Sequence, residues 1–322
     1  GGGRRAAMEY NVFRFCRFLR LVGNLMVVFV VALLMLSYVP IVLGIYGPQI
    51  VRHESVGGVL GGLAVVLIFH AVAAIMLWAY LRCVMTDPGS VPPGWRPEGI
   101  PDEVAHMGPT PAFLQQYDKE DPTRPRWCRK CEVWKPPRAH HCSLCGKCVL
   151  KMDHHCVWVV NCVGERNYKY FILFLFWAFV ECLFSVIVLL PYFIQFFKGE
   201  TSAEGTVAVS FMAFVIDAAL ALSLLGFIAM HLNLVFTNCT TIEAFEKAAT
   251  SPWPFDRGSR MDNFRDVFGH RKKLWLLPVP ASTPSTLNLH FEHRPIIRQP
   301  LTYGQGYSHS RSLSSRVDMV VT

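Results

Sequence analysis

Four long segments of the chain are almost free of charged residues. They run over residues 21–51, 55–81, 171–197 and 205–238. A helix needs about 20 apolar residues to cross the hydrocarbon core of a bilayer, and each segment is longer than that. Burial in a large soluble core is the alternative, but four such runs in one soluble chain are rare. The segments predict an all-α multi-pass membrane protein with four transmembrane helices.

The composition supports this fold class. Of the 322 residues, 52% are hydrophobic and only 17% are charged, whereas soluble domains carry about 25% charged residues. The formal net charge is +8, but the basic residues flank the apolar segments instead of gathering in one cluster. We therefore expect the lipid bilayer as a partner and no nucleic acid.

Lysine and arginine residues predict the orientation of the spans. The short connections between the first two and the last two spans hold only Arg52 and Lys198, respectively. Five arginines precede the first span, namely Arg4, Arg5, Arg14, Arg17 and Arg20. Because basic residues accumulate on the cytosolic side, both short connections should be exoplasmic. Both termini and the long segment between the second and third spans should then be cytosolic.

The chain divides into seven predicted parts. The segment after the second span is rich in proline and glycine, which indicates an irregular linker, and the polar end of the chain lacks an apolar period, which predicts disorder. The parts are a cytosolic N-terminus at 1–20, transmembrane helices 1 and 2 at 21–82, a cytosolic linker at 83–124, a cysteine-rich domain at 125–170, transmembrane helices 3 and 4 at 171–238, a cytosolic tail at 239–280 and a disordered tail at 281–322.

The cysteine-rich domain predicts metal binding. Seven of the eleven cysteines fall between Cys128 and Cys162, and cytosolic thiols stay reduced. Repeated Cys-x2-Cys turns are typical of structural zinc sites, each of which takes four ligands. The nine candidate ligands are Cys128, Cys131, His141, Cys142, Cys145, Cys148, His155, Cys156 and Cys162. Two closed zinc sites use eight of them, so one thiol is left over.

Cys156 is the best candidate for the spare thiol, because it directly follows Asp153, His154 and His155. A thiolate is a nucleophile, an imidazole can take its proton, and a carboxylate can orient that imidazole. A strand would place residues 154 and 156 on one face. The alternative makes Cys156 a zinc ligand and leaves Cys162 as the spare thiol. Asp153 would then serve only to orient a histidine ligand.

Further motifs lie outside this domain. They are Asp87-Pro88-Gly89 after the second span, Thr240-Thr241-Ile242-Glu243 after the fourth, and Asn263-x3-Val267-Phe268-Gly269 in the tail. Together with the cysteine-histidine spacing, they resemble the DHHC zinc-finger protein S-acyltransferases (palmitoyltransferases) over roughly residues 10 to 280. The run from Cys156 to Cys162, with Trp158 retained, is similar to the plant branch of that family.

The resemblance implies an activity and assigns its residues. Two structural zinc ions would be bound, one by Cys128, Cys131, His141 and Cys148 and the other by Cys142, Cys145, His155 and Cys162. Cys156 would carry the acyl group, with His154 as base and Asp153 as its partner. Thr241, Asn263 and Trp158 would support the site. Acyl-CoA would be the co-substrate, and cytosolic cysteines of membrane-associated proteins would be the acceptors. The protein would reside in the Golgi or another endomembrane, with the plasma membrane as the alternative.

Glu181 lies about ten residues into the third span, or roughly 15 Å at 1.5 Å per residue. A carboxylate at that depth is costly and usually faces the bundle interior. We hypothesise that Glu181 closes the acyl pocket and limits chain length; a structural contact between helices is the alternative. Its candidate partners are Asp217, His70 and Tyr38, and His231 is expected at the interface.

Two other classes of protein use similar ligands. A membrane-anchored zinc scaffold or RING-like ubiquitin ligase also interleaves paired zinc sites, but it needs neither the spare thiol nor the tail motifs. A zinc hydrolase needs an open coordination position.

Basic residues of the cysteine-rich domain are expected either to bind the phosphates of CoA or to form a solvated face. These residues are Arg126, Arg129, Lys130 and Lys135.

Overall fold

The computed structural model describes residues 16–52, 55–97, 100, 108–110, 113, 124–198, 204–246 and 253–281. Most of the N-terminal segment 1–20 and the tail from residue 282 lie outside these residues. The cytosolic N-terminus and the disordered tail therefore stay predictions.

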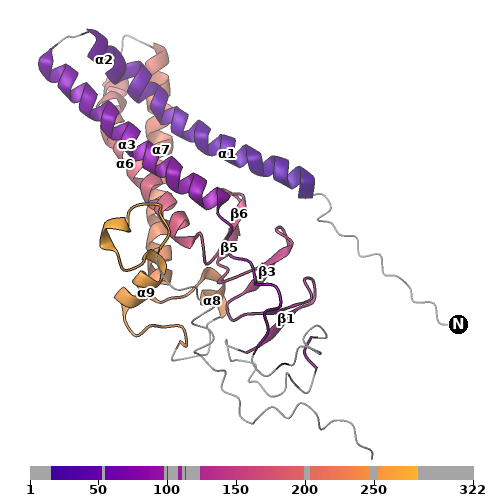
Figure 1. The fold of residues 1–322 in the computed structure, drawn as a ribbon. Coiled ribbons are helices and arrows are strands. Elements are labelled where there is room, and N and C mark those ends of the chain that lie inside the picture. The colour runs from indigo at the N-terminus through magenta and orange to yellow at the C-terminus, as the bar shows by residue number, and fades with distance from the viewer. Residues whose placement is uncertain are drawn as a thin grey trace, which may run out of the picture.

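Four long helical segments form one elongated bundle (Figure 1). The first is α1 (Cys16–Tyr38), which continues through the π-helix η2 (Val39–Tyr46) into α2 (Gly47–Arg52). The others are α3 (Val56–Met85), α6 (Tyr168–Lys198) and α7 (Glu204–Phe236). Within the described residues, these four are long and apolar enough to cross a membrane. The prediction of a multi-pass membrane protein with a mostly helical fold is confirmed.

The helix ends follow local signals in the sequence. The Ser55 hydroxyl accepts a hydrogen bond from Gly58 N at 3.0 Å and thereby caps the start of α3. The helix ends at Met85, just before Asp87-Pro88, because a residue that precedes proline disfavours the helical conformation. Helix α6 packs along both α3 and α7. Outward side chains such as Leu60 and Leu222 are exposed, as expected for a lipid-facing surface.

Three antiparallel hairpins lie at one end of the bundle (Figure 1). They pair β1 (Arg126–Cys128) with β2 (Val133–Lys135), β3 (His140–Cys142) with β4 (Lys147–Val149), and β5 (His154–Cys156) with β6 (Asn161–Val163). Strands of three residues are too short to show a period of two, so the sequence pattern does not predict them. The hairpins provide the turns on which the cysteines lie.

The beginning of the linker is fixed against these hairpins. Leu150 N donates to Gly89 O at 2.9 Å, and Arg166 N donates to Pro88 O at 3.1 Å. Gly89 has φ 108°, a left-handed conformation that favours glycine. The irregular segment after α3 therefore anchors the helix end to the cysteine-rich domain.

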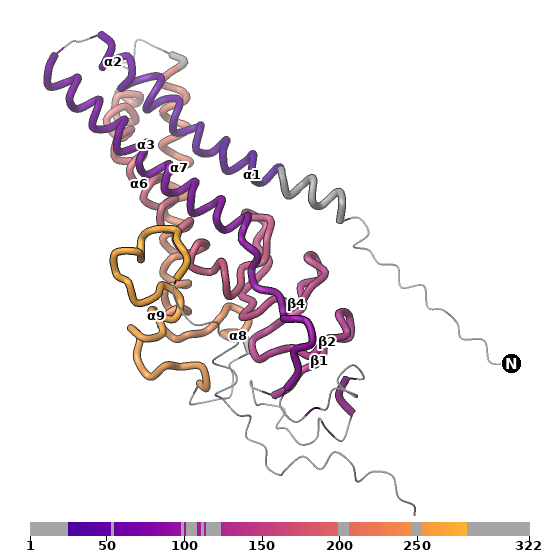
Figure 2. Tube along the Cα trace, in the orientation of Figure 1, coloured from indigo at the N-terminus to yellow at the C-terminus, as the bar shows by residue number. Residues whose placement is uncertain are grey.

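The tail folds back onto the bundle. It contains α8 (Thr241–Glu246), α9 (Arg260–Phe268) and the 3₁₀ turn η3 (Lys272–Leu274), and Figure 2 shows this orange segment beside the hairpin end of the bundle. Lys169 Nζ on α6 donates to Leu274 O at 2.9 Å, and Trp177 Nε1 donates to Leu276 O at 3.0 Å. The tail is thus tied to the start of a membrane span.

Candidate functional site

The first cysteine-histidine cluster joins two hairpins. Its members are Cys128, Cys131, His141 and Cys148. The Nδ1 atom of His141 lies 3.5 Å from the sulfur of Cys128, 3.2 Å from that of Cys131 and 3.9 Å from that of Cys148. A tetrahedral zinc shell with bonds of 2.0–2.3 Å places its ligands about 3.4–3.8 Å apart. The donor set and its spacing fit a structural zinc ion.

The second cluster has the same form. It consists of Cys142, Cys145, His155 and Cys162. The Nδ1 atom of His155 lies 3.6 Å from the sulfur of Cys142, 3.4 Å from that of Cys145 and 3.5 Å from that of Cys162. Hairpin β3–β4 contributes His141 and Cys148 to the first cluster and Cys142 and Cys145 to the second. The two zinc sites therefore interleave, as the resemblance implied.

Cys156 belongs to neither cluster among the described residues. It ends β5, where the extended backbone places His154 and Cys156 on one face and turns His155 toward the second cluster. His154 Nδ1 lies 2.7 Å from Asp153 Oδ2, which leaves Nε2 as the ring nitrogen available to the thiol. The structure thus brings the predicted acid, base and thiol together.

The electrostatic environment favours a charged pair. Burial alone would lower the pKa of His154, but its hydrogen bonds with Asp153 and Cys156 raise that pKa to about 9. Burial alone would raise the pKa of the Cys156 thiol, but the hydrogen bond with His154 and the backbone N–H groups of Val159 and Trp158 lower it. The site therefore stabilises a thiolate beside an imidazolium.

The turn after Cys156 is anchored to the end of α3. Asn161 Nδ2 donates to the carbonyl groups of Cys83, Val84 and Thr86 at 2.9–3.2 Å, and these are carbonyls that the helix terminus leaves without internal partners. Tyr80 Oη donates to Trp158 O at 3.0 Å. These bonds fix the position of the nucleophile relative to a membrane span.

The Trp158 side chain contributes in a different way. It is 44% exposed, and its ring lies 6.0 Å from that of Phe29 on α1. The neighbouring Val157 is 59% exposed. The supporting role expected of Trp158 thus has two visible components, a backbone contact with α3 and an aromatic contact with α1.

Thr241 connects the tail directly to Asp153. Its backbone N and its hydroxyl both donate to Asp153, at 2.9 Å each, across 88 positions of sequence. Asp153 is 1% exposed and accepts three hydrogen bonds in all, counting the one with His154. These bonds hold the carboxylate in one orientation. Burial alone would raise the pKa of Asp153, but the hydrogen bonds with His154 and Thr241 lower it, and the net pKa is below the ordinary value.

A buried ion pair holds the tail motif in place. Arg138 Nε and Nη2 donate to the two carboxylate oxygens of Glu243 at 2.7 Å each. Arg138 also donates to the side chain and the carbonyl of Asn238, at 3.1 and 2.8 Å. The paired side chains are 2% and 6% exposed. Removing one partner would leave a buried charge uncompensated, which typically costs about 3–5 kcal/mol.

Asn263 acts at the other end of the tail. Its Nδ2 donates to Phe236 O, at the end of α7, and to Asp256 Oδ1, at 2.8 and 2.9 Å. Its Oδ1 accepts from Arg257 N at 2.9 Å. Asn263 therefore ties the tail to the end of α7.

A cavity of about 340 Å³, the bundle cavity, lies between the helices, and Cys156 is among the residues that line it. His154, Trp158 and Phe171 line it near the nucleophile, and Glu181 and Asp217 line it deeper in the bundle. Most of the other lining residues are aliphatic or aromatic. An apolar cavity that ends at a nucleophile can hold a hydrocarbon chain with its reactive end at the sulfur.

Glu181 is 5% exposed, accepts from the Ser185 hydroxyl at 3.3 Å and lies near Asp217 and Cys182. Asp217 accepts from the Ser37 hydroxyl at 2.8 Å. Of the three partners expected for Glu181, only Asp217 lies beside it.

The other two expected partners of Glu181 interact elsewhere. His70 Nδ1 lies 2.8 Å from Val66 O on its own helix, and the Tyr38 ring packs against Phe69 and His70.

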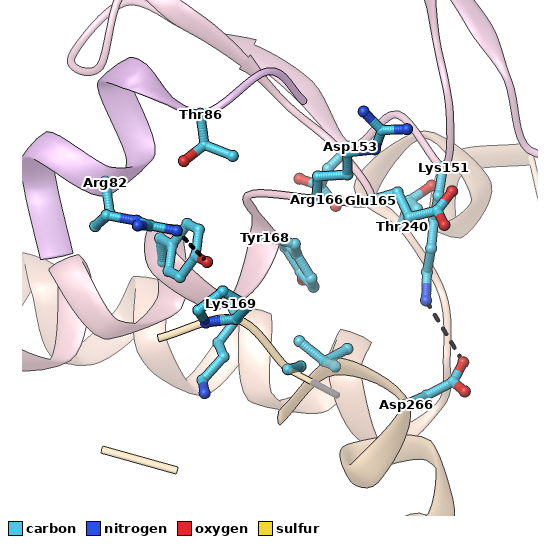
Figure 3. A pocket seen from close by; sticks show the side chains of 14 residues that line it. Arg82, Thr86, Lys151, Asp153, Glu165, Arg166, Tyr168, Lys169, Thr240 and Asp266 are labelled. Atoms are coloured by element: carbon cyan, nitrogen blue, oxygen red, sulfur yellow. Dashed lines mark hydrogen bonds and ion pairs between the residues drawn. The ribbon is translucent and has the colours of Figure 1, made fainter. Parts of the chain in front are cut away.

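A second cavity, of about 390 Å³, is lined partly by residues of the tail, and we call it the tail cavity (Figure 3). Asp153, Tyr168, Thr240 and Asp266 are among its lining residues. Lys151 points toward Asp266, with 3.8 Å between Nζ and Oδ2. Asp153 therefore lines the tail cavity, while His154 and Cys156 line the bundle cavity.

Several site residues give no signal in the sequence. Arg138, Asn238 and Tyr168 stand in no motif that the sequence analysis identified, and each makes its contact with a residue more than 60 positions away. His231, expected at the interface, is 2% exposed and lies against His154, with 6.1 Å between the ring centres. Packing of distant segments produces these contacts, so the local spacing of residues in the sequence does not predict them.

A protein-family model matches the cysteine-rich part of this chain, and known proteins align with most of its length. The family model of the DHHC palmitoyltransferases matches residues 121–248. Probable protein S-acyltransferase 14 of Arabidopsis thaliana is 47% identical over 279 residues, which cover 84% of this chain and 89% of that protein. Probable protein S-acyltransferase 13 of the same plant is 45% identical over 280 residues, with 84% and 90% coverage.

A human protein extends the comparison beyond plants. Palmitoyltransferase ZDHHC20 of Homo sapiens is 34% identical over 292 residues, which cover 85% of this chain and 77% of that protein. With two interleaved zinc sites, a thiol outside both of them, and relatives that align along most of its length, the chain belongs to the DHHC palmitoyltransferase family.

Proposed function

We propose that this protein is a membrane S-acyltransferase that moves a fatty acyl group from acyl-CoA, through Cys156, to cysteines of other proteins. The observation that carries the proposal is the position of Cys156. It lies outside both zinc shells, beside His154, and in the lining of a mostly apolar cavity between membrane helices. No other described cysteine combines these three properties.

In the first step, the Cys156 thiolate attacks the carbonyl carbon of the acyl-CoA thioester. A bond from Cys156 sulfur to carbon forms, the bond from carbon to the CoA sulfur breaks, and CoA leaves as a thiolate. The protonated His154 supplies the proton that converts this leaving group to a thiol. Asp153 holds the imidazole in the required orientation through the 2.7 Å bond to Nδ1.

In the second step, a cysteine of the acceptor protein enters as a thiol. His154, now neutral, takes its proton, and the resulting thiolate attacks the acyl carbon on Cys156. The new thioester forms as the bond to Cys156 breaks, which regenerates the thiolate–imidazolium pair. Both steps exchange one thioester for another, so catalysis depends mainly on position and on the charged state of the sulfur.

The zinc ions supply a rigid framework for this chemistry, because closed four-ligand sites have no open position for substrate. Cys142, Cys145, His155 and Cys162 would hold the ion nearest the nucleophile. His155 precedes Cys156 and Cys162 pairs with His155 across the hairpin, so this shell fixes both sides of the catalytic turn.

The bundle cavity is proposed to receive the acyl chain. Helix α6 rises about 15 Å between Phe171 and Glu181, at 1.5 Å per residue. An extended hydrocarbon advances roughly 1.25 Å per carbon, given C–C bonds near 1.5 Å. About twelve carbons therefore fit between these two levels, and a few more fit between Phe171 and the sulfur. This length suits a palmitoyl chain with its end near Glu181.

Replacing Glu181 with alanine is expected to favour longer acyl chains, because the change removes a polar wall from the end of the cavity. Each newly accommodated methylene should raise the rate for a longer chain about fourfold relative to palmitoyl-CoA, from its burial energy of about 0.8 kcal/mol. The measurement is the profile of autoacylation rates with acyl-CoAs of 14 to 20 carbons. Leu190→Ala, at an exposed position on the same helix, is the control.

An unchanged profile in Glu181→Ala would leave Glu181 with a structural contact between helices as its only role. A profile that shifts in both variants would indicate a general loosening of α6 and would also contradict the assignment.

CoA phosphates are proposed to lie over the hairpins. Lys130 donates to Ser143 Oγ at 3.2 Å. Lys135 is half-buried, and burial together with Arg126 lowers its pKa. Arg129 is exposed. A phosphate over this face would relieve the repulsion between Arg126 and Lys135, which supports binding over a purely solvated surface.

The orientation is proposed from the charged residues. Both termini and the hairpins would face the cytosol, where acyl-CoA is present and thiols stay reduced. The Golgi or another endomembrane is the proposed location, and membrane-associated proteins with cytosolic cysteines are the proposed acceptors.

The proposal is tested with the purified full-length protein in detergent or lipid nanodiscs. Incubation with palmitoyl-CoA should add one acyl group that hydroxylamine releases, and addition of a cysteine-containing lipidated peptide should move that group to the peptide. A membrane-anchored zinc scaffold or a RING-like ubiquitin ligase would form no such adduct. Absence of the adduct in protein that retains two zinc ions per chain would reject the proposal.

A further inference from the structure

His231 on α7 lies at the catalytic end of the bundle cavity. It is 2% exposed, and it lines this cavity together with His154, Cys156 and Phe171. Its ring centre is 5.1 Å from that of Phe171, in an edge-on arrangement, and 6.1 Å from that of His154. His231 therefore stands beside His154 in the wall of the cavity that Cys156 also lines, although it comes from the last membrane helix and from outside every motif.

The hydrogen bond to Tyr168 determines which nitrogen of His231 carries a proton. Tyr168 Oη lies 3.1 Å from His231 Nδ1. Tyr168 is 6% exposed, and this nitrogen is the partner that the structure gives its hydroxyl among the described residues. Because a buried hydroxyl proton needs an acceptor, the phenol donates to Nδ1. A neutral His231 then carries its proton on Nε2.

Tyr168 also separates the two cavities. Its ring lines the tail cavity, where Figure 3 shows it near the centre, while its hydroxyl reaches the histidine that lines the bundle cavity. The orientation of His231 is thus fixed from behind, by a residue that has no contact with the acyl chain's cavity.

The other polar groups near Cys156 already have hydrogen-bond partners or belong to a zinc cluster. The two ring nitrogens of His154 serve Asp153 and Cys156, and the backbone N–H groups of Trp158 and Val159 serve the Cys156 sulfur. His155 belongs to the second zinc cluster. The sulfur is therefore well supplied with donors, whereas the carbonyl oxygen of a bound thioester has none of these. Two side-chain N–H groups of the described residues at this end of the cavity remain, the indole N–H of Trp158, which is 44% exposed, and the Nε2–H of His231, which is 2% exposed. Of the two, the His231 donor is buried, and Tyr168 holds its ring in place.

We propose that His231 is a catalytic residue that donates a hydrogen bond from Nε2 to the carbonyl oxygen of the acyl thioester. The inference rests on the proposed acyl transfer. When the Cys156 thiolate attacks, negative charge moves from sulfur to that oxygen, and the Nε2–H stabilises the charge until the carbon–sulfur bond to CoA breaks. The proton stays on His231, so the step is balanced without a further reactant.

The test measures two reactions of the same sulfur. Single-turnover acylation of Cys156 by palmitoyl-CoA develops charge on a carbonyl oxygen, whereas alkylation of Cys156 by iodoacetamide does not. His231→Ala should lower the acylation rate about 100-fold, the usual effect of removing one such donor. Its alkylation rate should stay within about twofold of the wild type. His231→Gln, which keeps an N–H donor near the Nε2 position, should recover at least tenfold of the lost rate.

Parallel losses of acylation and alkylation in His231→Ala would show that His231 only positions His154, which overturns the proposal. Acylation at the wild-type rate, or a glutamine variant no faster than alanine, overturns it as well.

If the His231→Ala protein binds fewer than two zinc ions, its fold is impaired and Tyr168→Phe becomes the test variant. This change keeps the aromatic ring of residue 168 but removes the hydroxyl that donates to His231 Nδ1. An acylation rate about tenfold lower, with alkylation unchanged, supports the proposal, and a wild-type rate rejects it. Failure of acyl transfer itself would be distinct, since the wild type would then form no adduct on Cys156.

Discussion

Serine in place of Cys156 is expected to abolish the hydroxylamine-sensitive acyl adduct and to lower transfer to acceptor cysteines by about 10³-fold or more. A serine hydroxyl stays protonated beside His154, whereas the site stabilises the cysteine as a thiolate. The substitution exchanges sulfur for oxygen in a residue that is 6% exposed, so the packing changes little. Intact-protein mass spectrometry after incubation with palmitoyl-CoA measures the adduct directly.

The matched control for Cys156→Ser is Cys239→Ser. Cys239 is also buried, at 4% exposed, and it lies next to the tail motif, but it does not line the bundle cavity. The Cys239 variant should keep the adduct, and both variants should keep two zinc ions per chain. An adduct that persists in zinc-loaded Cys156→Ser would place the acyl group on another residue and would contradict the assignment of the nucleophile.

Loss of the second zinc ion should affect activity more than loss of the first. Cys131 and Cys145 are a matched pair, because each is the second cysteine of a Cys-x2-Cys turn and each is partly exposed. The shell of Cys145 includes His155 and Cys162, which flank Cys156, whereas the shell of Cys131 contains no residue of hairpin β5–β6. Cys145→Ser should therefore loosen hairpin β5–β6, which carries Cys156, whereas Cys131→Ser should loosen mainly hairpin β1–β2.

The expected values follow from the contribution of structural zinc to folding, about 10–16 kcal/mol in small zinc domains. Each variant should fall from two zinc ions per chain to about one. Autoacylation should fall at least about 100-fold in Cys145→Ser and about 10-fold in Cys131→Ser. Zinc is measured by mass spectrometry of the metal, and acylation in a single turnover. Two zinc ions retained in Cys145→Ser, or equal losses of activity in both variants, would contradict this division of roles.

The membrane spans and the zinc ligands could be predicted because their signals are local. The length of an apolar run determines whether a helix crosses a bilayer, and the four predicted runs match α1–α2, α3, α6 and α7 to within a few residues. A Cys-x2-Cys turn places two sulfurs on one metal whatever surrounds it. These features need no knowledge of distant contacts.

The residues that support the nucleophile could not be predicted in this way. Arg138 and Glu243 are 105 positions apart, and their buried ion pair forms only because the tail folds back onto the hairpins. Asn263 was expected to support the site from the tail, and its side chain links the tail to the end of α7 through Phe236 O, 27 positions away. Short hairpins gave no periodic signal either, since each strand has three residues.

The sequence by itself determined that this protein has four membrane spans and nine candidate ligands, one more than two closed metal sites need, because the length of the apolar runs and the residue spacing are enough for both. Residue spacing left open whether Cys156 or Cys162 is the spare thiol, and the family resemblance implied Cys156. The tertiary structure decided it, because it gathers eight ligands into two shells with the Cys156 thiol outside both. It also decided what surrounds that thiol. Helices α1, α3, α6 and α7 enclose the cavity, the tail reaches Asp153, and His231 comes from the last span. The physical reason is that buried polar side chains need partners, and packing brings those partners from distant parts of the chain.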